Sequence, residues 1–338
     1  MNPFIAALPA DLQRTVKKVP QPDWIHPMLA TLSEQVFSDQ QWIFEQKFDG
    51  ERCITYRTDD QIRMSSRNRT ILNDTYPELL EAFREQKMVD FIVDGEVVAF
   101  GGGIPKFSVL QQRIGVSEPD ERVMRDIPVY YYLFDLLSLD GYDLTGIPLL
   151  ARKALLRGLF SYGSAIRFSE HRQGEGETCF RIACQRGLEG VIAKRADSRY
   201  LQRRSTDWLK FKCQKRQEFV IGGYTEPKKS RVGFGAILIG YYRGNILVYA
   251  GKVGTGFDEA TLQVLYGAFR SLEQTESPFE EMKDQKGVHF IRPVLVADIG
   301  FTEWTDEGKL RHPRFIRIRS DKPPREVVRE EPDHHILT

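Results

Sequence analysis

The stretch Glu45-Gln46-Lys47-Phe48-Asp49-Gly50-Glu51-Arg52 decides how the rest of the chain is interpreted. Its lysine lies between the apolar run Trp42-Ile43-Phe44 and the β-prone run Cys53-Ile54-Thr55-Tyr56, so we expect two short strands joined by a turn. An apolar strand edge partly desolvates an ammonium group, and the nearby guanidinium of Arg52 repels it. Because both effects lower the pKa of a lysine, the pattern predicts a nucleophilic Lys47. A surface lysine in a β-turn is the plainer interpretation, and only the rest of the chain can decide between the two.

The composition is that of a globular protein, with 338 residues of which 41% are hydrophobic and 28% charged. No apolar run approaches the roughly 18 residues that a membrane span requires, and no basic leader precedes a long apolar stretch at the N-terminus. We therefore expect no membrane partner and no secretory signal. The four cysteines form no C-x-x-C pair, which argues against a zinc site or a disulfide framework and fits a reducing cytoplasm. Each is expected to be a small buried hydrophobe: Cys53, Cys179, Cys184 and Cys213.

The net charge of +1 is unevenly distributed along the chain. Six cations lie between Arg203 and Arg216 against the single acid Asp207, and eight lie between Lys309 and Arg329 against two acids. Local cationic faces matter more for phosphate binding than the overall sum. A solvated charged face is the alternative interpretation of both clusters.

Hydrophobic periodicity divides the chain into two regions with a boundary near residue 216. The first region is predicted to contain a short helical arm at 11–18, helices at 77–85, 151–160 and 179–186, and strands at 42–46, 52–57, 61–66, 91–100, 129–137, 190–194 and 208–212. The strand at 91–100 is expected to be interrupted at Asp94-Gly95. After residue 218, short β runs separated by glycines surround one helix at 259–272, which suggests a small barrel.

Five stretches stand out in order, and taken singly each has a plain structural explanation. They are Lys47–Arg52, Asp94-Gly95-Glu96, Leu133-Phe134-Asp135, Glu189–Lys194 and Trp208–Lys212. Together, in this order and with this spacing, they resemble the covalent nucleotidyltransferase superfamily and, within it, the ATP-dependent DNA ligases. The resemblance runs from about Pro27 to Glu330, and Arg319-Ser320-Asp321-Lys322 matches the family's last motif. The sequence looks most like the compact bacterial ligases related to end-joining repair.

This resemblance implies an α+β fold. A nucleotidyltransferase (ATP-grasp-like adenylation) domain of antiparallel sheets with flanking helices would occupy 27–216, after a short arm at 1–26. An OB-fold β-barrel would occupy 217–338. It also implies a cytoplasmic, nucleoid-associated monomer, whose partners are nicked double-stranded DNA and an end-bridging or clamp protein.

The chemistry of the resemblance places Lys47 as the group that attacks the α-phosphorus of ATP and forms a lysyl–AMP intermediate. Lys210 and Lys212 share one face of a strand and would aim two ammonium groups at the α-phosphate. Glu96 and Glu189 are hard oxygen donors suited to Mg²⁺, with Mn²⁺ as an alternative. Whether Glu96 contacts the metal or the ribose stays open.

Other nucleotide contacts follow from the resemblance alone. Phe134 would supply the aromatic face against adenine, and Glu45 matches a position beside the adenine edge. Arg52 and Arg67 would contact the ribose and the phosphates. Arg204 matches a family arginine, but the segment before Trp208 lacks the usual Pro-Gly pair and is about one residue shorter, so the roles of Arg203 and Arg204 stay open.

The later steps would involve the second domain. AMP would pass to the 5′-phosphate of a nick, and the adjacent 3′-hydroxyl would then displace it. Arg319 and Lys322 would close over the pyrophosphate during the first step, which implies a hinge near 212–218.

Two other interpretations stay open. An RNA ligase or a capping guanylyltransferase would use the same lysine, although the motif at 319–322 favours DNA ligase. A non-catalytic nucleic-acid-binding module would form no covalent adduct. An NAD-dependent ligase would carry an extra N-terminal module and a Cys-rich zinc element, so ATP is the expected donor.

Overall fold

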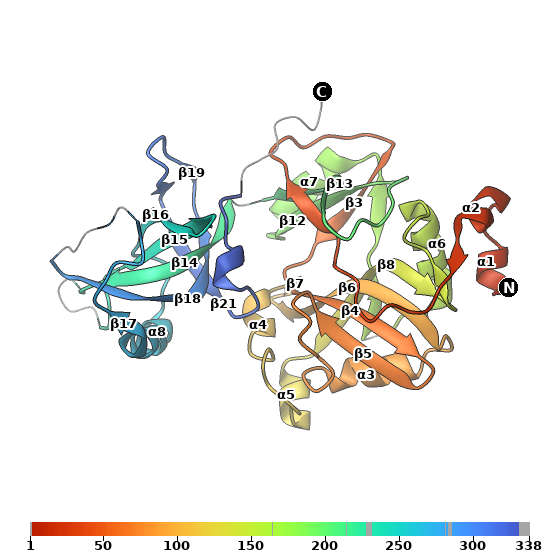
Figure 1. Ribbon diagram of the computed structural model, residues 1–338, viewed down its shortest axis with the longest axis horizontal. Coiled ribbons are helices and arrows are strands. Elements are labelled where there is room, and N and C mark those ends of the chain that lie inside the picture. The colour runs from red at the N-terminus through yellow and green to blue at the C-terminus, as the bar shows by residue number, and fades with distance from the viewer. Residues whose placement is uncertain are drawn as a thin grey trace. The chain divides into compact units, whose positions relative to one another are not determined.

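The computed structural model describes residues 2–163, 165–213, 215–227, 232–280, 282 and 286–330. The chain divides into two compact units, Met1–Cys213 and Gln214–Glu331, which are described separately here (Figure 1). No helix in the described ranges is long and apolar enough to cross a membrane.

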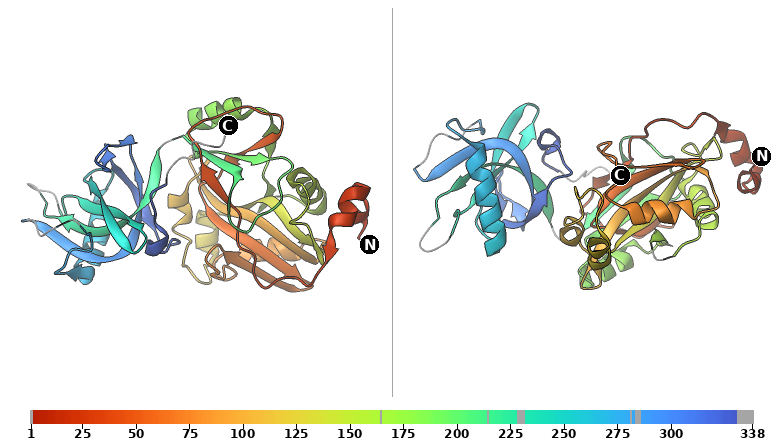
Figure 2. Two further views of the ribbon diagram at one scale, coloured as in Figure 1. Left: turned by 45° about the horizontal axis from the view of Figure 1, so that its top comes forward. Right: turned by 90° about the horizontal axis from the view of Figure 1, so that it is seen from below.

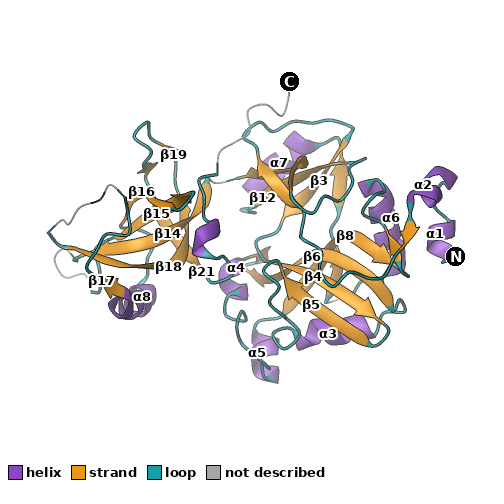
Figure 3. Ribbon diagram, viewed as in Figure 1, coloured by secondary structure: helices purple, strands orange, loops and turns teal. Residues whose placement is uncertain are grey.

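The first unit contains two β-sheets with helices outside them (Figure 3). The larger sheet has the strand order β1-β9-β8-β6-β4-β5, with β10 beside β8 and β7 beside β6. Its strands are β1 (Lys17–Lys18), β4 (Glu51–Thr58), β5 (Gln61–Ser66), β6 (Asp90–Gly101), β7 (Ile104–Pro105), β8 (Val129–Leu139), β9 (Tyr142–Asp143) and β10 (Ile166–Phe168). All its pairs are antiparallel except that of β10 with β8.

One face of the larger sheet packs on helices through the main hydrophobic core. Apolar side chains of the surrounding helices enter this core, with Leu79 and Phe83 among the fully buried ones. Apart from the helix that covers the smaller sheet, the helices of this unit are α1 (Pro3–Ala6), α2 (Ala10–Thr15), α3 (Pro77–Arg84), α4 (Phe107–Leu110), α5 (Glu121–Asp126) and α6 (Leu149–Leu159). The predicted helical arm therefore ends at Thr15, since Lys17 and Lys18 pair with β9 as a strand.

The smaller sheet has the order β11-β3-β12-β13-β2. Its strands are β2 (Leu29–Leu32), β3 (Trp42–Lys47), β11 (His171–Gln173), β12 (Gly190–Arg195) and β13 (Arg204–Lys212). Helix α7 (Gly176–Gln185) covers its outer face over Phe44, Val191 and Phe211 (Figure 2). The inner face meets the larger sheet through a core that includes Trp208 and Phe134. The two strands around the lysine turn, β3 and β4, thus belong to different sheets.

Strand register sets which side chains share the inner face. Lys47 pairs with Gly190, which pairs in turn with Lys212. Directly paired residues point to the same face of a sheet, and neighbouring strands lie about 4.8 Å apart. Gly190 has a φ of +150°, and a Cβ there would lie 1.9 Å from the carbonyl oxygen of Phe211, so only glycine fits between the two lysines.

The second unit is a strongly bent sheet of order β16-β15-β14-β18-β17, with β21 beside β18. Its elements are β14 (Arg216–Thr225), β15 (Ile237–Arg243), β16 (Ile246–Val253), α8 (Glu259–Leu272), β17 (Glu273–Gln274), β18 (Val288–Gly300), β19 (Glu303–Trp304), β20 (Leu310–Arg311), β21 (Arg314–Arg319) and a 3₁₀ turn at Pro324–Glu326. Strand β18 pairs with β14 on both sides of a register shift at Ile221/Gly223, which bends the sheet around a single core. This arrangement is consistent with an OB-type barrel.

Two expectations from the sequence are wrong. Strand β6 is continuous through Asp94 and Gly95, where a turn was expected, and the irregularity lies in β8, because Asp94 pairs with Asp135 and Gly95 with Leu133. Cys184 and Cys213 form a disulfide with a Cα–Cα distance of 5.2 Å. The two cysteines are 29 residues apart in the sequence. Cysteine spacing alone does not reveal which residues the fold brings together, so the pair was not predicted. Cys179 is half-buried and unpaired, and only Cys53 is the buried hydrophobe that was expected.

Candidate active site

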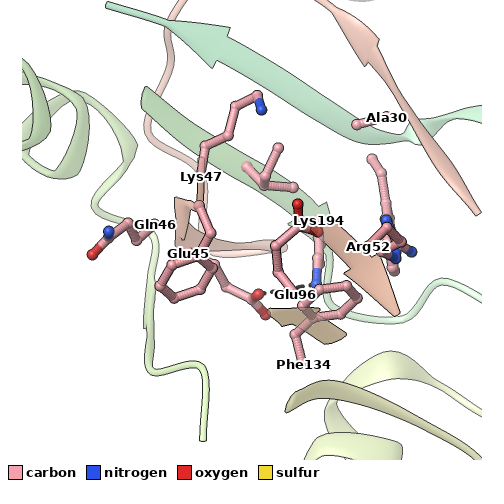
Figure 4. A pocket seen from close by; sticks show the side chains of 11 residues that line it. Ala30, Glu45, Gln46, Lys47, Arg52, Glu96, Phe134 and Lys194 are labelled. Carbon is pink, nitrogen blue, oxygen red and sulfur yellow. Dashed lines mark hydrogen bonds and ion pairs between the residues drawn. The ribbon is translucent and has the colours of Figure 1, made fainter. Parts of the chain in front are cut away.

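A pocket opens between the inner faces of the two sheets of the first unit (Figure 4). The smaller sheet contributes residues from β2, β3, β12 and β13, and the larger sheet contributes one residue each from β4, β6 and β8. The lining residues are Ala30, Glu45, Gln46, Lys47, Phe48, Arg52, Glu96, Phe134, Ile192, Lys194 and Trp208. The pocket therefore collects Lys47, Arg52, Glu96, Phe134 and Glu45, all of which were expected at the nucleotide site.

Lys47 ends β3, and its ammonium lies 2.7 Å from Oε1 of Glu189. The lysine side chain is 19% exposed and the glutamate 7%. Glu189 immediately precedes Gly190, so the β3–β12 pairing brings the two side chains together. The charged group in contact with the Lys47 ammonium is thus Glu189, whereas Arg52 lies against Asp94. Lys47 therefore has to leave this ion pair before its nitrogen can act as a nucleophile.

Arg52 is neutralised by a buried carboxylate. Its Nε and Nη2 donate to the two carboxylate oxygens of Asp94 at 2.5 and 2.6 Å. Tyr200 donates its hydroxyl to the same carboxylate at 2.7 Å. Burial disfavours the charged guanidinium, but Asp94 more than compensates and raises the pKa of Arg52. Arg52 is thus a fixed cation of the pocket wall, held by an aspartate in the neighbouring strand β6.

Glu45 is the centre of a buried network. Its Oε1 lies 2.8 Å from the ammonium of Lys153, and its Oε2 lies 2.9 Å from that of Lys194. Ser169 donates its hydroxyl to Oε2 at 3.0 Å. Burial disfavours the carboxylate, but the two lysines overcome this effect and lower the pKa of Glu45. Each carboxylate oxygen lies beside a lysine ammonium, so the part of Glu45 at an adenine edge would be to hold Lys194.

Lys194 lies against two aromatic rings. Its ammonium is 4.1 Å from the ring centroid of Phe134 and 4.2 Å from that of Trp208. Burial lowers the pKa of Lys194 to about 8, with Glu45 acting in the opposite direction. The buried indole N–H of Trp208 has no hydrogen-bond partner within the described part of the chain. The aromatic end of the pocket thus offers a cation and an unsatisfied donor to a bound molecule.

Glu96 contributes a carboxyl group that resists ionisation. Burial raises its pKa to about 8, against the opposing effects of Arg52 and Lys47. The nearby carboxylates of Glu189 and Asp94 raise it further. A site with this concentration of acidic groups would gain from a bound divalent cation.

The remaining predicted residues lie outside this pocket wall. Strand register pairs Lys210 with Ile192 and Lys212 with Gly190. Both lysines therefore lie on the same sheet face as Lys47. Arg67 lies in the turn that follows β5. Arg204 is exposed and donates to the carbonyl oxygen of Ala30. Their proposed phosphate contacts remain predictions.

Arg319 and Lys322 belong to the second unit, where they share an acidic partner. Arg319 lies 3.2 Å from Glu218 and 2.6 Å from Asp321, and Lys322 lies 3.1 Å from Glu218. Burial disfavours the charge of Arg319, but Asp321 and Glu218 together raise its pKa. The two motif cations are thus held close to each other.

Sequence reasoning assigned no role to several residues of the site. Asp94 and Lys194 stand inside quoted motifs, and Trp208 begins the alternating run that ends at Lys212. Their positions in strands that carry predicted ligands could have identified them. Lys153 gives no such signal, because it lies on α6, a helix far from the motifs in sequence.

Comparison with known families covers both units. Residues 27–212 match the ATP dependent DNA ligase domain, and residues 230–322 match the ATP dependent DNA ligase C terminal region.

Individual relatives agree with these matches. The chain is 37% identical over 336 residues to the multifunctional non-homologous end joining protein LigD of Pseudomonas aeruginosa, covering 97% of this chain and 39% of that protein. It is 30% identical to the SPbeta prophage-derived DNA ligase-like protein LigB of Bacillus subtilis, covering 86% of this chain and 98% of that protein. A solved structure of mycobacterial DNA ligase D complexed with ATP and MES has a TM-score of 0.64 at 36% identity, covering 90% of this chain and 98% of that one. The chain spans about two fifths of the length of the LigD relatives it matches.

Proposed function

The chain belongs to the ATP-dependent DNA ligase family, and we propose that it seals breaks between a 5′-phosphate and a 3′-hydroxyl in double-stranded DNA. Family membership confirms the resemblance drawn from the five ordered motifs and the fold class that it implied. The observation that carries the proposal is the Lys47–Glu189 pair at a pocket that also holds Arg52, Glu96 and Phe134.

In the first step, the neutral amine of Lys47 attacks the α-phosphorus of ATP. A P–N bond forms, the P–O bond to the β-phosphate breaks, and pyrophosphate leaves. Glu189 is the carboxylate within hydrogen-bonding distance that can take the proton from the ammonium. Arg52 offers a fixed positive charge to phosphate oxygens, since Asp94 holds its guanidinium in place. Lys210 and Lys212 lie on the same face and would add to this field.

The residues present fit a divalent cation. Glu96 and Glu189 are carboxylates that raise each other's cost of ionisation, and this repulsion is what a bound cation would relieve. The described residues contain no cluster of three or more metal-ligating side chains, so phosphate oxygens would complete the coordination. Mg²⁺ or Mn²⁺ would neutralise phosphate charge as pyrophosphate leaves.

The base is proposed to bind at the aromatic end. Phe134 offers a ring for stacking, and Trp208 offers the unsatisfied indole N–H. Lys194 would present its ammonium to a ring nitrogen of adenine, oriented by Glu45. ATP is the donor that the family implies.

For the later steps, we propose that AMP passes to the 5′-phosphate at the break before the 3′-hydroxyl displaces it. An adenylation domain at 27–216 would work with a barrel domain at 217–338, whose Arg319 and Lys322 would contact pyrophosphate. The relatives named as end-joining proteins make DNA double-strand break repair the proposed pathway, with an end-bridging protein as partner and the bacterial nucleoid as the place of action.

Incubation with ATP labelled at the α-phosphate and Mg²⁺ tests the proposal. We expect label on the wild-type chain after bound AMP has been removed, and none on Lys47→Ala. Lys87→Ala, which changes an exposed lysine outside the pocket, is the matched control and should label normally. No label on the wild type would overturn the proposal. Preferential labelling by GTP would move the protein to the capping class.

A further inference from the structure

The disulfide between Cys184 and Cys213 joins two segments that flank the proposed catalytic glutamate. Cys184 lies in the last turn of α7, five residues before Glu189. Cys213 follows the end of β13 and donates its backbone N–H to the carbonyl oxygen of Glu189 at 3.1 Å. The bond and this hydrogen bond therefore hold the connection between α7 and β12 from both sides.

The same bond anchors the end of the first unit. The first unit runs from Met1 to Cys213, and the second unit begins at the next residue (Figure 1). In the smaller sheet, Lys212 pairs with Gly190, so the anchored segment also carries one of the predicted phosphate-binding lysines. A cross-link at Cys213 thus fixes both the loop of Glu189 and the origin of the chain that leads to the barrel.

Both cysteines are partly accessible, which distinguishes them from a sealed structural bond. Each is half-buried, whereas Cys53 is fully buried. Thiol–disulfide exchange requires access of a second sulfur along the attack direction, so exposure is a condition of reversibility.

We propose that Cys184 and Cys213 are a reversible thiol–disulfide modification site that holds Glu189 opposite Lys47. In the forward direction, one thiolate attacks a low-molecular-weight disulfide R–S–S–R and releases one R–S⁻. The other thiolate then displaces the second R–S⁻ and closes the protein bond. The two cysteines lose two protons and two electrons, and R–S–S–R is reduced to two R–SH. The functional part of the proposal rests on the ligase function proposed above.

Reduction frees the connection 186–189 from its covalent anchor. A loop tied at one end by backbone hydrogen bonds alone opens more often than one that is also cross-linked. We therefore expect the backbone at Arg186 to open more often in the reduced protein, which would also hold the Lys47–Glu189 geometry less well.

Three measurements on the full chain test this site. Oxidised glutathione is the oxidant and dithiothreitol the reductant. Alkylation under denaturing conditions should count two free thiols in the oxidised chain and four in the reduced chain, since the sequence has four cysteines. Trypsin cleavage after the exposed Arg186 should be roughly fivefold faster in the reduced form, because proteolysis follows the open population. Self-adenylation should be several-fold slower in that form.

Cys184→Ser should show the reduced behaviour under both conditions. Cys179→Ser is the matched control, because Cys179 lies on the same helix and is unpaired, and it should respond to the reagents like the wild type. A thiol count that neither reagent changes would overturn the proposal, as would equal cleavage rates or equal adenylation rates in the two forms. Absence of adenylation in both forms would instead overturn the ligase function, while thiol count and proteolysis would still decide the modification site.

Discussion

The two ends of the pocket use the same residue types in opposite ways. At the aromatic end, Glu45 is 3% exposed and is held by two ammonium groups and a hydroxyl. At the open end, Lys47 lies 2.7 Å from Glu189, and the lysine is partly exposed. Both ends contain glutamate–lysine pairs, but the lysine side chain of the first pair is 2% exposed and that of the second is 19% exposed.

This difference gives the closed, aromatic end a structural role and the open end a catalytic role. A buried carboxylate with several partners is costly to disturb, because removal of one partner leaves uncompensated charge in a low dielectric. The Lys47 side chain is 19% exposed, so water can solvate its ammonium when the ion pair with Glu189 opens. The closed network can therefore fix the shape of the base site. The Lys47 nitrogen, in contrast, can leave Glu189 and attack a phosphorus atom.

Substitution at the closed end should have the largest effect on stability. Glu45→Gln leaves Lys153 and Lys194 facing each other without a countercharge, so we expect the free energy of unfolding to fall by about 3 kcal/mol. Chemical denaturation of the variant measures this loss.

A double variant serves as its control. Glu45→Gln combined with Lys153→Met removes one of the two uncompensated charges, and it should recover part of the lost stability. A double variant as unstable as the sum of the single changes would show that the network is not coupled.

The same substitution at the open end should affect chemistry more than stability. Glu189→Gln is expected to change the free energy of unfolding by no more than about 1 kcal/mol. We expect self-adenylation to slow by about 100-fold, because the variant loses the proton acceptor and one carboxylate for the metal. A stability loss as large as that of Glu45→Gln would erase the distinction between the two ends.

Lys322 tests whether the second unit contributes to the open end. Lys322→Ala should slow self-adenylation by roughly tenfold, since it removes one cation proposed for pyrophosphate. Sealing of a pre-adenylated nick should change less, because pyrophosphate has already left. Equal losses in the two assays would contradict this division of roles.

The sequence predicted the open end better than the closed end. Lys47, Arg52 and Glu96 stand in short ordered motifs, and their strand assignments alone place them on neighbouring elements. Pairing partners were harder to predict. Asp94 neutralises Arg52 across two adjacent strands, and strand register is not visible in composition or periodicity.

Partners on helices and loops gave even less signal. Lys153 reaches Glu45 from α6, and Cys184 reaches Cys213 over 29 residues. Contacts of this kind depend on how elements pack in three dimensions, and local propensity does not encode them. For the same reason, the sequence could not show that Arg52 would pair with Asp94 and Lys47 with Glu189.

The smallest expected effect concerns Glu96, which lies between the two ends. Its pKa is raised to about 8, so the folded protein keeps a proton between about pH 4.5 and 8 that the unfolded chain has lost. The free energy of unfolding should therefore fall as pH rises through this window. Glu96→Gln removes this contribution.

Relative to the wild type, the Glu96→Gln variant should gain about 1.3 kcal/mol between pH 6 and pH 7. Melting temperatures of the two proteins at both pH values measure the difference. Glu85→Gln, which changes an exposed carboxyl at the end of α3, is the control and should follow the wild type. Wild-type and Glu96→Gln melting temperatures that stay parallel across this range would mean that Glu96 ionises freely. The open end would then need no cation to offset its carboxylates, and the case for a metal bound by Glu96 would be lost.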